Sequence, residues 1–303
     1  MLRRCIACFS RAGASCDRSP KVDSNPDAKE IEELDEEEPQ QLDPESKKSS
    51  APRGPKVGGG SSQSAVLVEL FTSQGCSSCP PADLLISQLG QAKSSDVALE
   101  VPIVVLGFHV EYWDFMGWKD PFANSTWTLR QRNYGQALQQ DSIYTPEVVV
   151  QGRSHCIASS LEPILALIHQ APRFAAPDIT ISFKLETEPE RVLDTTMEAI
   201  IKFKVDKFTL DIMVALYENG LVTNCQKGEN KGRILTNDFV VRSIAKAATL
   251  HDWPARKTVR EHFKLPLWDT FNRTKCGAVV FLQNPSTMEV YGAQMVPLPE
   301  DLP

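Results

Sequence analysis

The stretch VLVELFTSQGCSSCPPAD, residues 66–83, decides the expected fold. Its first six residues are apolar except for Glu69, as in a strand that is buried in a sheet. Polar residues and Gly75 interrupt the run before the sequence Cys76-Ser77-Ser78-Cys79. Residues 82–91 then place leucines at helical spacing, which predicts a helix. The cysteine pair is therefore expected where a strand passes into the N-terminus of a helix.

This position predicts reactive thiols. The partial positive charge of a helix N-terminus favours a thiolate over a thiol. We expect Cys76 to be the exposed nucleophile, and Cys79 to lie deeper and to resolve a mixed disulfide. Gln74, next to the pair, is a candidate hydrogen-bond donor to a substrate. Two other interpretations stay open: a metal site, which would need further ligands, and a silent structural pair.

A second apolar run, residues 101–108, predicts a central strand of a parallel sheet. Polar residues directly after such a strand lie at the edge where α/β proteins place their sites. His109 is either a proton shuttle for the dithiol or a hydrogen-bonded structural residue, and Glu111 is either a proton acceptor or a loop cap. Tyr112 and Trp113 either form an aromatic wall for a substrate or fill a gap under a loop.

Further elements follow in the first half of the chain. The pattern predicts a helix over residues 124–140 and a strand over 143–152, which is entered through Thr145-Pro146. A short strand over residues 156–158 is expected to pair with it as a hairpin. Residues 161–170 predict a closing helix.

The order strand, dithiol, helix, strand, helix, Pro-led strand, strand and helix resembles the thioredoxin fold. The resemblance implies a cis peptide bond before Pro146, facing the dithiol, and a backbone of Thr145 that pairs with an extended thiol substrate. Longer motifs are similar to an uncharacterised thioredoxin-like family with bacterial and plant members: ELFTSQGCSSCPPAD, HVEYWD, GWKDPF, YTPEVVVQG and GENKGRILTNDFVVR. This resemblance covers most of residues 65–298 and implies thiol–disulfide chemistry, without an established substrate.

The second half of the chain has a different pattern. Apolar and polar residues alternate from Ile179 to Leu185 and from Ile201 to Val205, which is typical of antiparallel strands with one buried face. Residues 278–295 predict a hairpin, whereas residues 237–249 are not assigned. We expect a β-sandwich-like domain here, in which the polar loop 225–233 is an ordinary hairpin loop or binds an anion.

The predicted organisation has three parts. They are a disordered acidic tail with a Gly/Ser linker over residues 1–62, an α/β thioredoxin-like domain over 63–175 and an antiparallel β-sandwich-like domain over 176–303. Within the tail, residues 23–48 contain 11 Asp and Glu but 3 Lys, a composition that cannot bury enough apolar surface to fold. The basic segment before it is either incidental, an organelle-targeting peptide, or an acylation site at Cys5 and Cys8; otherwise we expect a cytoplasmic protein.

Composition limits the function further. The chain has 303 residues and a formal net charge of −7, which argues against a nucleic-acid partner. No apolar run reaches the length of about 18 residues that a transmembrane helix needs. Eight Cys in 303 residues are too sparse for a protein whose fold is held together by disulfides.

The sequence therefore predicts a thiol–disulfide oxidoreductase with a redox-active CxxC. Cys76 and Cys79 would act on protein or small disulfide substrates, with an unidentified electron donor and without a cofactor or a bound metal. Residues Thr145, Pro146, Gln74, His109, Glu111, Tyr112 and Trp113 are the candidate substrate-binding residues. The alternative is a non-catalytic binding or scaffold module of the same fold, whose thiols would hold a metal.

Overall fold

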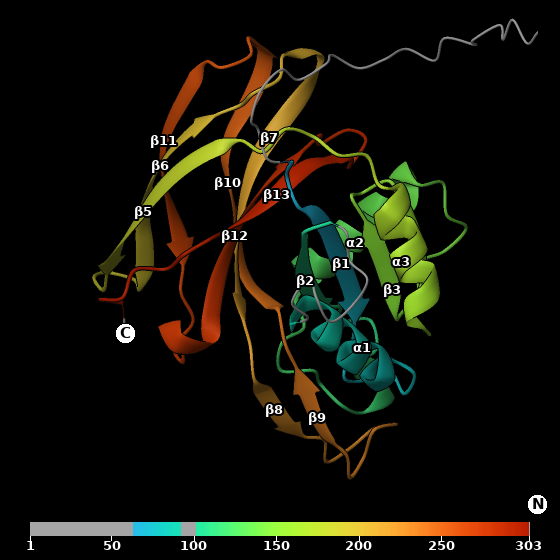
Figure 1. Ribbon diagram of the computed structural model, residues 1–303. Coiled ribbons are helices and arrows are strands. Elements are labelled where there is room, and N and C mark those ends of the chain that lie inside the picture. Colours follow the sequence, from blue (N-terminus) through green and yellow to red (C-terminus); the bar gives the residue numbers. More distant parts are fainter. Residues whose placement is uncertain (1–62, 92–100, 303) are drawn as a thin grey trace, which may run out of the picture. The chain divides into compact units, whose positions relative to one another are not determined.

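A computed structural model describes residues 63–91 and 101–302 of the chain (Figure 1). These residues form one compact unit. The predictions for the N-terminal tail, which are its disorder, its targeting role and its acylation at Cys5 and Cys8, lie outside the described residues.

The described residues form thirteen strands, three α-helices and two short 3₁₀ helices. In chain order these are β1 (Val66–Thr72), α1 (Cys79–Gln91), β2 (Ile103–His109), η1 (Asp114–Met116), α2 (Ser125–Ala137), β3 (Glu147–Val150), β4 (Ser154–Ile157), α3 (Leu161–Gln170), β5 (Asp178–Glu186), β6 (Val192–Ile200), β7 (Val205–Glu218), β8 (Leu221–Asn224), β9 (Ile234–Asn237), β10 (Val240–Trp253), β11 (Thr258–Pro266), η2 (Arg273–Lys275), β12 (Cys276–Gln283) and β13 (Val290–Val296).

Most of these strands join one mixed sheet of eight strands, in the order β13-β12-β7-β10-β2-β1-β3-β4. β1 and β2 are parallel, whereas β3 and β4 run antiparallel to their neighbours. β7, β10, β12 and β13 pair antiparallel with one another. The two groups meet where β10 pairs with β2 at Val240 and Gly107. The remaining strands form a three-stranded sheet, β11-β6-β5, and the hairpin β8–β9.

The predicted fold class is therefore wrong. We expected an α/β thioredoxin-like domain followed by a separate β-sandwich-like domain, but the described residues are predominantly β, and one mixed sheet runs through both halves of the chain. The connection is made by the backbone, because the N–H of Gly107 donates to the carbonyl of Phe239 over 2.7 Å. Periodicity identifies a strand but does not identify a partner that is distant in the sequence, and this pairing was missed.

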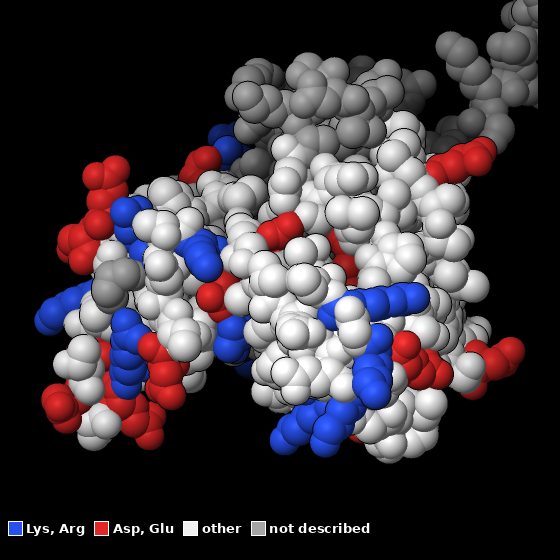
Figure 2. All heavy atoms as spheres, turned by 90° about the horizontal axis from the view of Figure 1, so that it is seen from below, with Lys and Arg blue, Asp and Glu red and all other residues white. Residues whose placement is uncertain are grey.

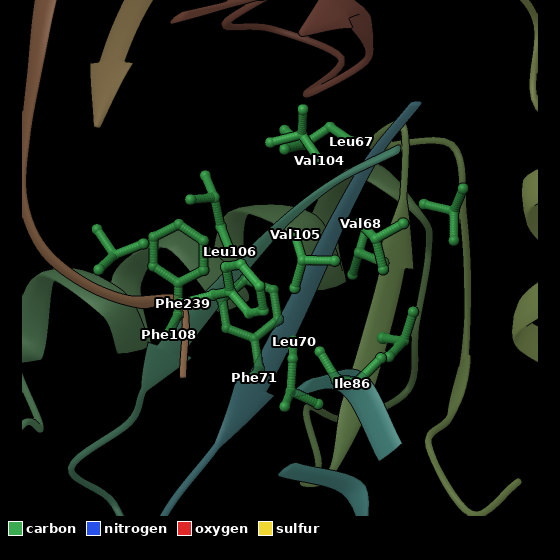
Figure 3. Packing of buried hydrophobic residues seen from close by; sticks show 14 of the residues in the cluster. Leu67, Val68, Leu70, Phe71, Ile86, Val104, Val105, Leu106, Phe108 and Phe239 are labelled. Carbon is green, nitrogen blue, oxygen red and sulfur yellow. The ribbon is translucent and has the colours of Figure 1, made fainter. Parts of the chain in front are cut away.

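The central strand β1 is buried on both faces of the sheet. All seven of its residues are buried, and alternate side chains point to opposite faces. Phe71 packs edge-on against Tyr134 of α2, with ring centroids 5.9 Å apart. On the other face, Leu70 points toward Ile86 of α1 (Figure 3). Helices therefore cover both sides of this part of the sheet, which explains its nearly continuous apolar sequence.

Phe239, from the second half of the chain, packs into this core beside Phe108 and Leu106 (Figure 3). Gly90 of α1 makes room for its ring, because a Cβ at Gly90 would lie 2.5 Å from a ring carbon of Phe239. A glycine at position 90 therefore lets the ring of Phe239 pack closely against α1.

A second apolar cluster lies between the three-stranded sheet and the strands β7, β10 and β12. Its buried members include Leu193 and Met197 of β6, Ile212 of β7 and Leu282 of β12. Figure 1 shows these long strands continuing away from the helices toward β5, β6 and β11. The second half of the chain thus has its own core but shares the large sheet.

Local elements agree well with the sequence in several places. α3 has the predicted bounds, and α2 begins after Asn124, whose side chain accepts a hydrogen bond from the N–H of Thr126 and so caps the helix. The alternation from Ile201 to Val205, in contrast, crosses the turn between β6 and β7 and is not one strand. Most of the unassigned segment 237–249 belongs to β10.

Candidate functional site

The turn between β1 and α1 brings the two cysteines together. The thiol of Cys79 donates to the sulfur of Cys76, with the two Sγ atoms 2.8 Å apart. The hydroxyl of Ser78 lies 3.2 Å from the same sulfur, and the carbonyl oxygen of Thr145 lies 3.9 Å from it. Both cysteines are free. The description of the pair as a redox-active CxxC is corrected accordingly: the structure contains a hydrogen-bonded dithiol and not a disulfide.

The two thiols differ strongly in acidity. The hydrogen bond from Cys79, which outweighs the opposing effect of burial, lowers the pKa of Cys76 to about 5, and Ser78 contributes in the same direction. Burial raises the pKa of Cys79 far above its ordinary value, as do its donation to Cys76 and the negative charge of Asp83. At neutral pH the pair therefore consists of a thiolate at Cys76 and a thiol at Cys79.

Both sulfur-bearing residues are covered. Cys76 is only 2% exposed and Cys79 is 0% exposed, so the prediction that Cys76 is the exposed cysteine is wrong. The two residues between them, Ser77 and Ser78, are exposed. The Cys76 sulfur thus lies just under the surface, and a local displacement is needed before a disulfide can reach it.

α1 begins at Cys79, and Cys76 belongs to the preceding turn. The N–H of Cys79 donates to the carbonyl of Cys76 over 3.3 Å, and the N–H of Cys76 donates to the carbonyl of Ser73 over 3.2 Å. Pro80 and Pro81 occupy the first helical turn, where the missing N–H groups have no helical acceptor. The hydrogen bond from the Cys79 thiol is the largest cause that stabilises the thiolate of Cys76.

A buried acid near the dithiol has no counterpart in our sequence predictions. Asp83 is buried on α1, four residues after Cys79 and so on the same helix face. Burial raises the pKa of Asp83 to about 7, although the positive charge of His109 opposes this shift. The spacing of four residues on the predicted helix was the signal that could have identified it.

His109 affects the dithiol only through Asp83, whose pKa its positive charge lowers. Its Nδ1 lies 2.7 Å from Oδ2 of Asp120, and its ring packs edge-on against Phe122. Burial alone would lower the pKa of His109, but the Asp120 carboxylate outweighs it and raises the pKa. The charged imidazole in turn lowers the pKa of Asp120, in spite of burial. Asp120 is a functional candidate that sequence reasoning missed, since only the folded loop places it beside His109.

The predicted aromatic residues hold the loops around the dithiol. Trp113 donates from Nε1 to the hydroxyl of Thr145 over 2.7 Å. It also packs on the turn before Cys76, because a Cβ at Gly75 would lie 3.0 Å from both Cβ and the carbonyl oxygen of Trp113. Tyr112 donates to Oε1 of Gln131 over 3.2 Å, and burial raises the pKa of this phenol.

Of the remaining predicted residues, Thr145 and Pro146 lie against the dithiol, whereas Gln74 and Glu111 have their contacts elsewhere. The peptide bond between Thr145 and Pro146 is cis, which confirms this part of the prediction, and the Thr145 carbonyl faces Cys76. Gln74 is buried, and the N–H groups of its side chain donate to Thr223 and Asn237 of the hairpin β8–β9. Its Oε1 accepts a hydrogen bond from Nε1 of Trp118 over 3.2 Å. Glu111 is exposed, and its N–H donates to the hydroxyl of Thr128. Their proposed contacts with a substrate stay predictions.

The hairpin β8–β9 reaches the dithiol turn from the second half of the chain. Its connecting loop places Asn230 against the carbonyls of Gln74 and Cys76, both 2.9 Å from Nδ2. Figure 2 shows the face of the molecule that is at the bottom of Figure 1, where α1 and this hairpin lie. Uncharged residues cover much of this face, and basic and acidic side chains are interspersed with one another around it.

Comparison with known proteins places the chain in a family. The model of a family described as a protein of unknown function, DUF1223, matches residues 67–283. The chain belongs to this family. The membership confirms the resemblance to an uncharacterised family, but it does not show a thioredoxin-like relationship. No curated protein matches the chain.

Two solved structures are similar to this DUF1223 protein. A protein from Agrobacterium tumefaciens, determined in a structural genomics programme, has 26% sequence identity and a TM-score of 0.54, over 80% of this chain and 99% of that chain. HBP35 of Porphyromonas gingivalis has 16% identity and a TM-score of 0.51, over 81% of this chain and 80% of that chain. The second likeness concerns the fold alone.

Two further properties of the DUF1223 chain bear on the predicted alternatives. In residues 63–91 and 101–302, no group of three or more His, Cys, Asp or Glu side chains has a geometry that would hold a metal ion. Among the helices of the same residues, none is both long and apolar enough to cross a membrane.

Proposed function

We propose that this protein is a thiol–disulfide oxidoreductase in which Cys76 is the nucleophile and Cys79 is the resolving thiol. The observation that carries the proposal is the contact of 2.8 Å between the two sulfurs, together with the opposite shifts of their pKa values. A thiolate attacks disulfides, and a neighbouring thiol can release the product by forming an internal disulfide. Asymmetric acidity divides these two roles between the two cysteines.

The reaction balances in two steps. The Cys76 thiolate attacks one sulfur of a substrate disulfide, forms a mixed disulfide and releases the other sulfur as a thiolate. The Cys79 thiol then gives its proton to the Asp83 carboxylate and attacks the Cys76 sulfur, which forms the internal disulfide and releases the second substrate thiolate. Because the pKa of Asp83 is about 7, a large share of this group is ionised at neutral pH and can accept the proton. An external dithiol donor then supplies two electrons that reduce the internal disulfide, and Asp83 returns its proton to Cys79. The two protons of the donor neutralise the two substrate thiolates.

Exposed apolar side chains near the site support a polypeptide as one class of substrate. Phe115 of η1, two residues after Trp113, is 80% exposed, and Leu84 of α1 is 54% exposed. Large exposed apolar side chains near a reactive group are typical of surfaces that bind other molecules. In a reducing cytoplasm, the compartment predicted from the sequence, the dithiol is the resting form and the protein acts as a reductant.

The test uses the full-length chain, reduced with dithiothreitol and then freed of it. It is mixed with oxidised glutathione, and mass spectrometry follows the peptide that contains both cysteines. We expect an internal disulfide in the natural protein, a trapped glutathione adduct on Cys76 in Cys79→Ser, and neither product in Cys76→Ser. Cys276→Ser, in β12, is the matched control and should behave as the natural protein does. Absence of both products from the natural protein would overturn the proposal.

A further inference from the structure

A loop from the second half of the chain encloses the turn that bears the dithiol. Residues 225–233 connect β8 to β9, and Gly232 N–H donates to the Cys225 carbonyl across the base of the loop over 2.7 Å. Gly228, with φ of +71°, packs against Trp118, since a Cβ at this position would lie 3.0 Å from that of Trp118. The loop is therefore fitted to the segment after Trp113 and is not a free hairpin end.

Asn230 makes the principal contact of this loop. Its side chain is fully buried, and its amide nitrogen donates to the carbonyls of Gln74 and Cys76, each over 2.9 Å. Its Oδ1 accepts a hydrogen bond from Arg233 over 3.0 Å. The amide thus uses both of its N–H groups and its oxygen, so the reversed orientation would place oxygen against two carbonyls. These bonds hold the backbone on both sides of Gly75.

Glu229, the neighbouring residue, places a negative charge near the dithiol turn, which disfavours the thiolate of Cys76. Its exposed carboxylate accepts a hydrogen bond from the N–H of Ser77 over 3.2 Å. That N–H belongs to the turn between Cys76 and Cys79, where a free N–H would favour the thiolate. A negative charge at this position disfavours a second negative charge on the sulfur of Cys76.

We propose that the loop 225–233 sets the reactivity of the dithiol: Asn230 holds the Cys76 backbone where the two sulfurs meet, and Glu229 opposes the Cys76 thiolate. Asn230 is a positioning residue, because it touches the turn and not the reacting atoms. The other charged or titratable groups near Cys76 are Cys79 and Asp83 of α1, with His109 and Asp120 behind them. The biological meaning of the inference rests on the proposed function, but its test does not.

The test measures how the alkylation rate of Cys76 by iodoacetamide depends on pH, in the full-length reduced chain, with mass spectrometry of the Cys76 peptide. Only the thiolate reacts, so the midpoint of the profile reports its acidity without any disulfide turnover. In Asn230→Ala we expect the midpoint to rise by about one pH unit, the shift expected for losing one good hydrogen bond. At pH 5, the rate should then fall about five-fold, since the thiolate share drops from about a half to about a tenth.

Glu229→Gln should move the midpoint in the other direction, by about half a pH unit, because it removes an exposed charge whose effect is screened by solvent. Asn224→Ala, exposed on the same hairpin, is the matched control and should leave the profile unchanged. If Asn230→Ala does not fold, Asn230→Ser replaces it, since Ser is uncharged and keeps one side-chain donor where Asn has two, and it should also raise the midpoint. An unshifted profile in a folded Asn230 variant overturns the inference, even when disulfide turnover is intact.

Discussion

The thiol of Cys79 donates to the sulfur of Cys76 over 2.8 Å, and this single contact is the largest cause of the low pKa of Cys76. Substitution Cys79→Ala removes the donor but keeps the size of the site nearly unchanged. We expect the pKa of Cys76 to rise by about two pH units, from about 5 toward the ordinary value of a thiol.

The measurement is the absorbance of the thiolate in the ultraviolet, followed against pH, with Cys76→Ser as the blank. Ser78→Ala removes a weaker contact with the same sulfur and serves as the control of smaller effect. If Cys79→Ala and Ser78→Ala shift the pKa equally, the hydrogen bond between the two sulfurs is not the principal cause.

Asp83 gives a prediction for stability against pH. Its pKa is raised to about 7 in the folded protein, whereas an unfolded Asp titrates near its ordinary value of 3.8. The folded state therefore holds a proton that the unfolded state has lost, and stability falls as the pH rises from about 4 to about 7. Asp83→Asn removes this loss, so the variant should be more stable above pH 7, by at most about 4 kcal/mol, and nearly neutral in effect below pH 4.

Urea unfolding at about pH 4 and about pH 8 measures this difference. Asp141→Asn, an exposed acid outside the site, is the control and should change stability little at either pH. An equal effect of Asp83→Asn on stability at both pH values would falsify the raised pKa of Asp83 in the folded protein.

The same substitution has a kinetic consequence under the proposed mechanism. An Asn at position 83 cannot accept the Cys79 proton, so formation of the internal disulfide should slow by about 100-fold or more, as is usual when a general base is lost. The first step, attack by Cys76, should keep its rate. Rapid mixing with oxidised glutathione and acid quenching separates the two steps, and equal slowing of both would contradict the role of Asp83.

Residues close together in the sequence made the dithiol predictable. Cys76 and Cys79 were identified from a short motif, and α3 from its apolar spacing, because neighbours along the chain determine these features. The cis bond between Thr145 and Pro146 was expected only from the resemblance to a known fold. Asp83 had a local signal too, at four residues from Cys79.

Other parts of the site depend on contacts between distant segments. Asn230 meets the carbonyl of Cys76 only because the hairpin β8–β9 folds across α1, and β10 joins β2 through the carbonyl of Phe239. Phe239 has a φ of +56°, a conformation that apolar alternation does not indicate. The continuous sheet was therefore missed for the same reason as the loop around the dithiol, and both corrections concern the second half of the chain.

A buried ion pair links α2 to the centre of the sheet. Arg130 contacts the carboxylate of Glu69 over 2.7 Å, and its guanidinium lies 5.2 Å from the ring centre of Phe108. Tyr134 donates to the same carboxylate, and Gln283 of β12 accepts from Arg130 over 3.0 Å. Arg130→Met leaves Glu69 charged and without its partner in the core, and we expect a loss of about 3–5 kcal/mol in the free energy of unfolding.

Urea unfolding measures this loss, and Arg132→Met, exposed on the same helix, is the matched control with an expected change within about 0.5 kcal/mol. Adding Glu69→Gln to Arg130→Met removes the unpaired charge and should recover part of the stability. If the double variant is destabilised by the sum of the single effects, the two residues are not coupled.

The contact between Gly90 and Phe239 tests how the second half of the chain is held against α1. An exposed helical Gly→Ala substitution would stabilise a protein by about 1 kcal/mol. At Gly90, however, the new Cβ would lie 2.5 Å from the ring of Phe239, which is 8% exposed and cannot move outward without breaking its packing. We expect Gly90→Ala to destabilise the protein by about 1–3 kcal/mol, the usual cost of overpacking a core.

The second substitution Phe239→Leu makes room for the methyl group, so the double variant should be more stable than Phe239→Leu alone. Thermal unfolding of the four proteins gives the coupling, and a stabilising effect of Gly90→Ala in the natural background would show that Phe239 does not pack on α1 in solution.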